Sequence, residues 1–522
     1  MNTQLPDDQQ PTSRWLFTRL FRCFRMAIQP GKLFLALILV LLVFLGGLLL
    51  DGLWGPQVLG GEFHQFYLHG TRGFDQFLDT TTADTEQELK ERIEIFDDST
   101  KTDETSDIVE LHDKAEGLVR RIKSDQFAAA REDHADDSEA RDAAIREIKT
   151  RYATIDNELR EIKPRGVFKA ALDIKLSAIK RMALASINPS TWFDDINQIL
   201  APLEELLTLP LWLWHAHPGF LITYLIIFVL IWSIFGGAIH RMATVEAADG
   251  EPVGAGHALV YVKRRWIHYV LAPLIPLIII IVIGALMALA GWIVFNIPGI
   301  NILGGIAYVF ALIGGFIMAL LLVGWAAGLP LMYPALSAEG SESFDAVSRS
   351  FSYVFARPWR LAWYVLVAMV YGAATYMFVG LFMHLVSYMA QAAVALGAAD
   401  VDLMLGERKF GDLLLHPDDA ELEGTAYLAA IFVFVWMQLF LLLIAAYAVS
   451  FFASAASTIY LLLRQHCDGT DVAEIHFDAP DPDDVAGSAE EKVEPETTPT
   501  STAESSTDSV PPPDSLDSAD DR

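Results

Sequence analysis

The chain alternates between long apolar stretches and polar or charged segments. A helix that crosses a bilayer needs about 20 consecutive, predominantly apolar residues, and six stretches approach or exceed that length. The pattern therefore predicts an all-α membrane protein with about six transmembrane helices. We expect these spans at residues 33–50, 219–239, 267–295, 303–329, 361–396 and 425–463.

The first stretch, residues 33–50, contains no charged residue and could be a retained anchor or a cleaved signal peptide. Its apolar run is longer than that of a usual signal peptide, and no A-x-A-like cleavage site follows it. We interpret it as a transmembrane anchor behind a cytoplasmic segment, residues 1–32. Arginines and phenylalanines on opposite faces of residues 14–26 predict a basic amphipathic helix. Ordinary flanking charge is the alternative and gives the same topology.

Lysine and arginine orient the remaining spans, because short cytoplasmic segments carry an excess of basic residues. Residues 14–32, 241–265 and 349–360 hold five, four and three of them, whereas the loops 296–302 and 397–424 hold none and two. This alternation predicts a multi-pass protein of the cell membrane with both termini in the cytoplasm. Residues 208–465 would then form a five-span membrane domain.

Residues 51–207 are the long polar region between the first and second spans, and we expect them outside the cytoplasm. Apolar residues recur there in alternating steps of three and four, which predicts a helical hairpin or short coiled coil and self-association through residues 84–187. A solvated helical linker with a narrow apolar stripe is the alternative. The two seams are Leu111, Ala115, Leu118 and Ile122, then Ile145, Ile148, Tyr152, Ile155, Leu159 and Ile162.

A short motif occurs twice, each time where a polar segment meets a span. It reads YVKRRWIHYVL at residues 261–271 and YVFARPWRLAWYVL at residues 353–366; we call these stretches the first and second elbow. A duplicated span–loop–span unit would resemble the parallel repeats of some transporters. Alternatively, such residues gather at any cytoplasmic membrane boundary. The candidate interfacial residues are Arg265, Trp266, Arg357, Trp359 and Arg360.

The segment before the second elbow predicts an amphipathic helix that lies on a membrane face. Ser341 is its expected N-cap, and Asp345 and Arg349 are spaced to form an ion pair. Because Pro358 disfavours helical geometry at the preceding residue, the helix should end or bend at Arg357. The expected apolar face comprises Phe344, Val347, Phe351, Val354 and Phe355.

The sequence SFDAVSRSFSYVFARPWR, together with the span–loop–span layout of residues 220–465, resembles uncharacterised bacterial multi-pass membrane proteins. Those proteins are loosely similar to the membrane domain associated with glycerophosphodiester phosphodiesterases. The resemblance covers under half of the chain, and the phosphodiesterase catalytic domain has no counterpart in it. It implies an envelope or membrane-associated role and no particular activity.

Composition and charge agree with a membrane protein and limit its partners. Hydrophobic residues make up 53% of the chain, and the net charge of −29 lies mainly in residues 51–207 (−13) and 468–522 (−15). Nucleic acid is therefore not an expected partner, whereas the lipid bilayer is. Residues 466–522 lack apolar runs and predict a disordered acidic cytoplasmic tail. Cys23 and Cys467 are the two cysteines of the chain and lie at its opposite ends, so this inventory predicts neither a disulfide framework nor a cysteine metal site.

Few residues suggest chemistry. His215 and His217 are weak candidates for a metal pair, and an interfacial aromatic belt with the adjacent tryptophans is the favoured interpretation. Gly324 and Gly328 have the spacing of helix-packing glycines. His384 is expected at the outer boundary of its span and Gln438 nearer mid-span. Hydrogen bonds between helices are the favoured role for both, and ligand binding is the alternative. No span core contains a charged residue, and no cofactor-binding or catalytic motif is present in the sequence.

The leading hypothesis is a non-enzymatic integral membrane protein of the cell envelope that acts by assembly or partner binding. The alternative is a transporter or lipid-handling channel built on two parallel repeats. A membrane-embedded enzyme ranks last, since neither clustered carboxylates nor an activated nucleophile can be recognised.

Overall fold

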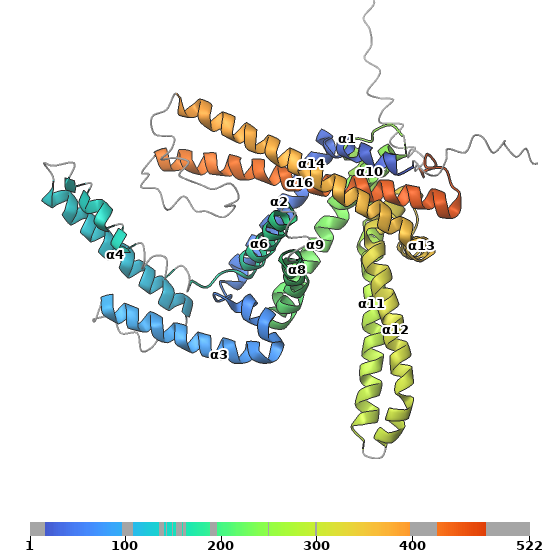
Figure 1. The fold of residues 1–522 in the computed structure, drawn as a ribbon, viewed down its shortest axis with the longest axis horizontal. Helices are drawn as coiled ribbons and strands as arrows, with labels where there is room; N and C mark the ends of the chain where they lie inside the picture. The colour runs from blue at the N-terminus through green and yellow to red at the C-terminus, as the bar shows by residue number, and fades with distance from the viewer. Residues whose placement is uncertain are drawn as a thin grey trace, which may run out of the picture. The chain divides into compact units, whose positions relative to one another are not determined.

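The computed structural model describes residues 16–96, 108–134, 140–141, 143–148, 150–152, 159, 163–187, 196–248, 250–297, 300–396 and 425–476. The described chain is helical, with one isolated antiparallel bridge between Val58 and Arg165. The predicted all-α membrane fold is confirmed: six helices are long and apolar enough to cross a membrane (Figure 1). The loop 397–424, the tail beyond His476 and the seam residues Ile155 and Ile162 lie outside the described residues.

The six spans run further than their apolar stretches. They comprise α2 (Pro30–Trp54), α9 (Pro218–Ile231) continued by η3 (Trp232–Gly236) and α10 (Gly237–Ala247), α11 (Ala255–Phe295), α12 (Ile300–Glu339), α14 (Pro358–Ala395) and α16 (Thr425–Asp468). Three of them begin at a proline, Pro30, Pro218 or Pro358, where the missing N–H has no helical partner to lose. α12 and α16 end at Gly340 and Gly469, whose φ of 61° and 70° favours glycine.

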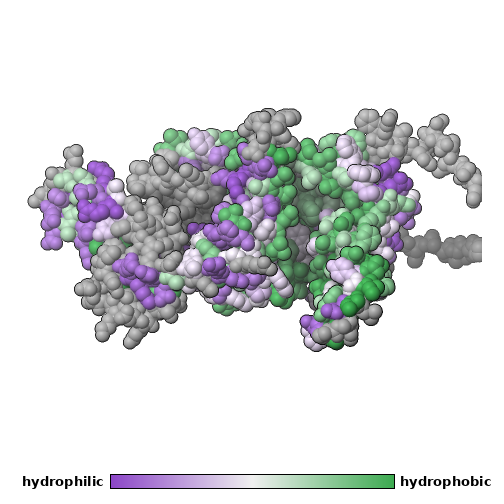
Figure 2. Space-filling view, turned by 60° about the horizontal axis from the view of Figure 1, so that its bottom comes forward, coloured by the Kyte–Doolittle hydropathy of each residue, from purple (hydrophilic) through white to green (hydrophobic). Residues whose placement is uncertain are grey.

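The parts of the spanning helices beyond the apolar stretches remain helical because the ends of the spans pack against one another. Every residue of α10 is buried, whereas the buried residues of α11 all lie in its first 22 positions, between Ala258 and Pro276. Beyond that level, α11 and α12 run side by side as a hairpin with exposed apolar side chains (Figure 1). Figure 2 shows broad hydrophobic areas (green) on the membrane helices and hydrophilic ones (purple) on α4. Lipid is the solvent that suits such a hairpin.

α16 lies at the centre of the largest core and contacts α2, α10, α12, α13 and α14. Small hydroxyl side chains let these helices approach closely while satisfying backbone carbonyls. Ser450 donates to the carbonyl of Ala27 at 2.9 Å, and Thr244 donates to Ser457 at 3.0 Å. The N-terminal helices η2 (Leu16–Arg22) and α1 (Cys23–Ala27) therefore dock on α16 rather than only lining a membrane surface.

Residues 51–207 contain two separate cores. In one, α6 (Val167–Ile187) and α8 (Asn197–Ala216) pack with the end of α2 and the start of α3 (Glu62–Phe96). In the other, which we call the arm, the end of α3 packs with α4 (Ile108–Asp133) and with described residues between 140 and 159. Both predicted seams enter the arm's core and meet α3, so the seam is covered within the chain. The buried residues of the arm's core are Leu89, Ile93, Leu111, Ala115, Val119, Tyr152 and Leu159.

The helix before the second elbow is α13 (Ser343–Ala356). Its N-cap is Glu342, without a side-chain hydrogen bond, so the prediction of Ser341 was wrong by one residue. The Asp345–Arg349 pair is confirmed at 3.1 Å, and the helix ends before Arg357 as predicted. The expected apolar face splits, because Val347 and Val354 are buried while Phe344 remains 68% exposed.

Candidate functional site

The two elbows share a backbone feature at matching positions. In the first elbow, Arg265 leaves helical geometry inside α11, with φ −120° and ψ 15°. In the second, Arg357 separates α13 from α14, with φ −137° and ψ 55°. In both copies, the bend is at the arginine that most closely precedes the first tryptophan.

Two tyrosines of each elbow hold the end of the helix that returns to it. In the first elbow, Tyr261 donates to the carbonyl of Leu336 at 3.1 Å, and the hydroxyls of Tyr269 and Ser337 lie 2.9 Å apart. Both partners lie in the last turns of α12.

The second elbow repeats this arrangement on α16. Tyr353 donates to the carboxylate of Asp468, and the Tyr364 hydroxyl lies 3.0 Å from Nε2 of His466. Burial raises the pKa of Tyr353, and its hydrogen bond to Asp468 raises it further. The phenol therefore stays neutral and acts as a donor.

Charged side chains meet where the elbows and span ends converge, and we call this cluster the elbow junction. Glu339, at the end of α12, accepts a hydrogen bond from Tyr460 at 3.2 Å. Its carboxylate also lies 3.2 Å from Nη1 of Arg464 and 3.5 Å from Nη1 of Arg349. The junction comprises Lys32, Arg241, Glu246, Glu339, Arg349, Arg464 and Asp468.

A second buried pair links the first span to α10. Nζ of Lys32 lies 2.5 Å from Oε2 of Glu246, and Gln29 donates to the other carboxylate oxygen at 2.6 Å. Both charged side chains are less than one-tenth exposed. Removing one partner of such a pair leaves an uncompensated buried charge, so the pair fixes how α2 meets α10.

Arg241 is held by two backbone carbonyls and an aromatic ring. Its guanidinium donates to the carbonyls of Ser337 and His476 and lies 4.1 Å above the ring of Tyr261. Carbonyl oxygens and an aromatic face can together solvate a guanidinium. The arginine thereby joins α10 to α12 and to the first elbow.

The junction also contains a buried thiol. Cys23 packs against α16 with Sγ 3.5 Å from Oγ1 of Thr458. Burial raises the pKa of Cys23 to about 11. Because the thiolate is the reactive form of cysteine, Cys23 is inert at neutral pH and serves as packing.

The candidate interfacial residues differ between the elbows. The guanidinium of Arg265 donates to the carbonyl of Gly340 and stands 5.4 Å from the Tyr261 ring. Trp266 is 45% exposed, whereas Trp359 is 87% exposed. Arg357 is exposed as well. The second elbow therefore presents its charge and its aromatic ring outward.

Gly324 and Gly328 face α13 rather than another span. A Cβ at Gly324 would lie 2.4 Å from Cε1 of Phe351, so only glycine permits the contact. A Cβ at Gly328 would meet the Cβ of Ser350 at an ordinary 3.5 Å. The predicted packing pair thus contains one position that requires glycine and one that does not.

His215 and His217 diverge toward different carboxylates of α3. Nε2 of His215 lies 3.1 Å from Asp75, and Nε2 of His217 lies 3.3 Å from Glu62. Trp212 is fully buried and donates to Glu62 at 3.2 Å, so it does not belong to an exposed aromatic belt. Within the described residues, the group of side chains close enough to share a metal ion is instead His112, Asp113 and Glu116.

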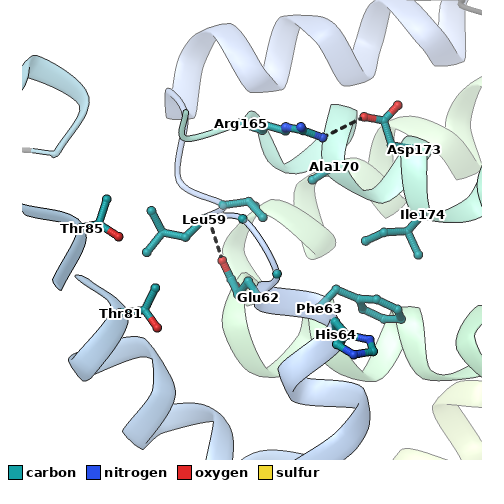
Figure 3. A pocket seen from close by; sticks show the side chains of 13 residues that line it. Leu59, Glu62, Phe63, His64, Thr81, Thr85, Arg165, Ala170, Asp173 and Ile174 are labelled. Carbon is teal, nitrogen blue, oxygen red and sulfur yellow. Dashed lines mark hydrogen bonds and ion pairs between the residues drawn. The ribbon is translucent and has the colours of Figure 1, made fainter. Parts of the chain in front are cut away.

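A pocket of about 610 Å³ lies beside Glu62 in the region between the first two spans (Figure 3). The backbone N–H of Leu59 donates to Glu62 at 3.2 Å, and Arg165 pairs with Asp173 at 3.5 Å across the pocket wall. Burial raises the pKa of Asp173, and Arg165 opposes that shift. Arg165 and Asp173 are therefore paired with each other, and Glu62 is held by the Leu59 backbone.

The junction pairs were missed at the level of sequence. Lys32, Glu246, Glu339 and Arg464 fall just outside the apolar stretches and count there only as flanking charge. The available signal was that all four flank span ends on the same predicted side of the membrane. Opposite charges at one membrane level can pair once helices extend beyond the bilayer.

No protein-family model matches the chain, and neither a curated protein nor a solved structure matches it.

Proposed function

We propose that this integral membrane protein acts by assembly or partner binding in the cell envelope, without catalysing a reaction. In this proposal both termini lie in the cytoplasm, and the elbow junction is the cytoplasmic end of the spans. The arm is then held on the opposite side, where its charged surface meets partners.

The location of buried charge carries the proposal. The buried charged side chains of the described spans lie within about two helical turns of a span end and are Lys32, Asp51, Arg241, Glu246 and Arg464. Asp51 accepts from the backbone N–H groups of Phe168 and Lys169, at 2.7 and 3.1 Å. Ionisable groups inside a bilayer usually mark ion or substrate pathways. Here they tie helices together instead, which favours a scaffold.

A transporter or lipid-handling channel is the second candidate. The observation that favours it is the shared geometry of the elbows, since Arg265 and Arg357 both interrupt a helix at the same motif position. Parallel repeats occur in transporters. A transporter would require the spans to move relative to one another. The ion pairs of the elbow junction oppose such a movement.

Lysine-specific cross-linking of intact membranes, read by mass spectrometry, tests the proposal. We expect cross-links to other proteins, or to a second copy, to concentrate on the arm lysines Lys90, Lys114 and Lys123. Reversing two exposed acids of α4, in Glu132→Arg/Asp133→Arg, should remove them without adding a reactive amine. The control Glu342→Arg reverses an exposed acid outside the arm and should keep them.

Two results would overturn the scaffold proposal. One is an arm without any cross-link to another polypeptide. The other is solute flux through proteoliposomes containing the purified chain, which would support the transporter.

A further inference from the structure

The second elbow carries two arginines that no described carboxylate neutralises. Arg357 is exposed and Arg360 half-buried, and neither lies within ion-pair distance of a described acidic side chain. The nearby Arg349, by contrast, pairs with Glu339 and Asp345. Guanidinium groups match the geometry of phosphate oxygens and bind them with paired hydrogen bonds. These two arginines are therefore available to an anionic ligand.

Exposed aromatic rings place the arginines at a membrane boundary. Trp359 is 87% exposed and Trp363 is 52% exposed, both in the first two turns of α14. Exposed tryptophans at the start of a spanning helix sit at the headgroup level of a bilayer. The guanidinium groups beside them would then face lipid phosphates.

An apolar pocket lies between α12 and α13, and one of its lining residues is close in sequence to the arginines. It has a volume of about 320 Å³ and is lined by Ile317, Leu320 and Leu321 of α12 and by Phe351 and Phe355 of α13. Phe355 is two residues before Arg357, so the pocket opens near the same elbow. Its α12 side belongs to a candidate membrane span. A hydrocarbon chain is the occupant that such a lining favours at that level.

The geometry points to an anionic phospholipid bound at the second elbow, with its phosphate on Arg357 and Arg360 and an acyl chain against α12 and α13. The chain as a whole carries −29, which repels anionic surfaces in general. Screening limits that repulsion to about 10 Å, so a local pair of unneutralised arginines can still attract an anionic headgroup. At the matching position of the first elbow, Arg265 is instead engaged by Gly340 and Tyr261.

Native mass spectrometry of the full-length protein in detergent tests this site, with phosphatidylglycerol and phosphatidylcholine of identical acyl chains as probes. The wild-type protein should bind phosphatidylglycerol more tightly. Arg357→Gln/Arg360→Gln should weaken phosphatidylglycerol binding about thirty-fold, since each basic residue near an anionic headgroup contributes about a five-fold factor. Arg357→Lys/Arg360→Lys should keep most of the preference.

Two further variants separate charge from chain contact. The matched control Arg131→Gln/Arg151→Gln removes the same charge from exposed positions of the arm and should leave both affinities unchanged. Leu320→Trp fills the apolar pocket and should weaken both lipids by the same factor, leaving their ratio unchanged.

Equal affinity of the wild-type protein for the two lipids would overturn the inference, as would full phosphatidylglycerol binding by the glutamine variant. Normal binding by Leu320→Trp would overturn the acyl-chain position. Should the glutamine variant unfold, the wild-type protein still decides, because raising ammonium acetate, a volatile salt, from about 0.05 to 0.5 M should reduce its preference strongly. A preference unchanged by salt would count against the arginines.

Discussion

The two elbows are built from nearly the same motif and differ in what their arginine does. In the first, α11 continues through the bend, and Arg265 is drawn inward to the carbonyl of Gly340. In the second, Pro358 starts a new helix, and Arg357 points to the surface. The tyrosines act alike in both copies, so the motif secures a helix end in each case. The tyrosines therefore have the same structural role in both elbows. The arginine packs against the protein in the first elbow and is exposed for binding in the second.

Among the charged groups of the elbow junction, the Glu339 carboxylate should matter most. Glu339→Gln removes the carboxylate between the end of α12 and Arg464, whose side chain is 4% exposed. The buried guanidinium would lose its partner, so we expect the free energy of unfolding to fall by about 3 kcal/mol. Unfolding in mixed detergent micelles with increasing sodium dodecyl sulfate measures it.

Glu342→Gln is the control for that substitution. It removes the same charge from an exposed position three residues further along the chain, and its effect should lie within about 0.5 kcal/mol. Equal losses in both variants would mean that the junction does not depend on the Glu339 carboxylate.

The second elbow differs from the first because it follows a separate helix, α13, that packs against α12. Gly324→Ala forces a methyl group toward Phe351, and we expect a loss of about 1–3 kcal/mol from overpacking. Gly328→Ala has ordinary space beside Ser350 and should change the free energy of unfolding by less than about 0.5 kcal/mol. The same unfolding titration compares them. A larger loss at Gly328 than at Gly324 would contradict the placement of α13.

The fold class and the position of the second bend could be predicted from sequence, because apolar length and Pro358 act locally. The partners of the tyrosines could not, since Leu336 and Asp468 are 75 and 115 residues away from the hydroxyls that bind them. The sequence also could not predict that Gly324 requires glycine and Gly328 does not, because only the close approach of Phe351 to Gly324 distinguishes the two positions. Features set by neighbouring residues, such as a helix bend at proline, can be predicted from sequence. Side-chain contacts between helices depend on how the helix ends come together in the fold.

Removing one hydroxyl from each elbow measures how alike the tyrosine contacts are. Tyr269→Phe takes a partner from buried Ser337, so we expect a loss of about 1–2 kcal/mol. Tyr364→Phe takes one from His466, which water can reach, so the loss should be about 0.5 kcal/mol. Thermal unfolding followed by tryptophan fluorescence ranks the two. A larger loss for Tyr364→Phe than for Tyr269→Phe would show that the tyrosine contact of the second elbow contributes more to stability than that of the first.

A small effect should come from Pro358, which has no counterpart in the first elbow. Pro358→Ala restores a backbone N–H and a residue able to continue a helix, as in the first elbow. The bend should persist, because Tyr353 and Tyr364 still hold α13 and α14 to the end of α16. We expect a loss of only about 0.4–1 kcal/mol, chiefly from the greater freedom of the unfolded chain, with unchanged lipid preference at Arg357 and Arg360. A loss above about 2 kcal/mol, or a lost lipid preference, would show that proline rather than the tyrosine contacts turns the chain outward.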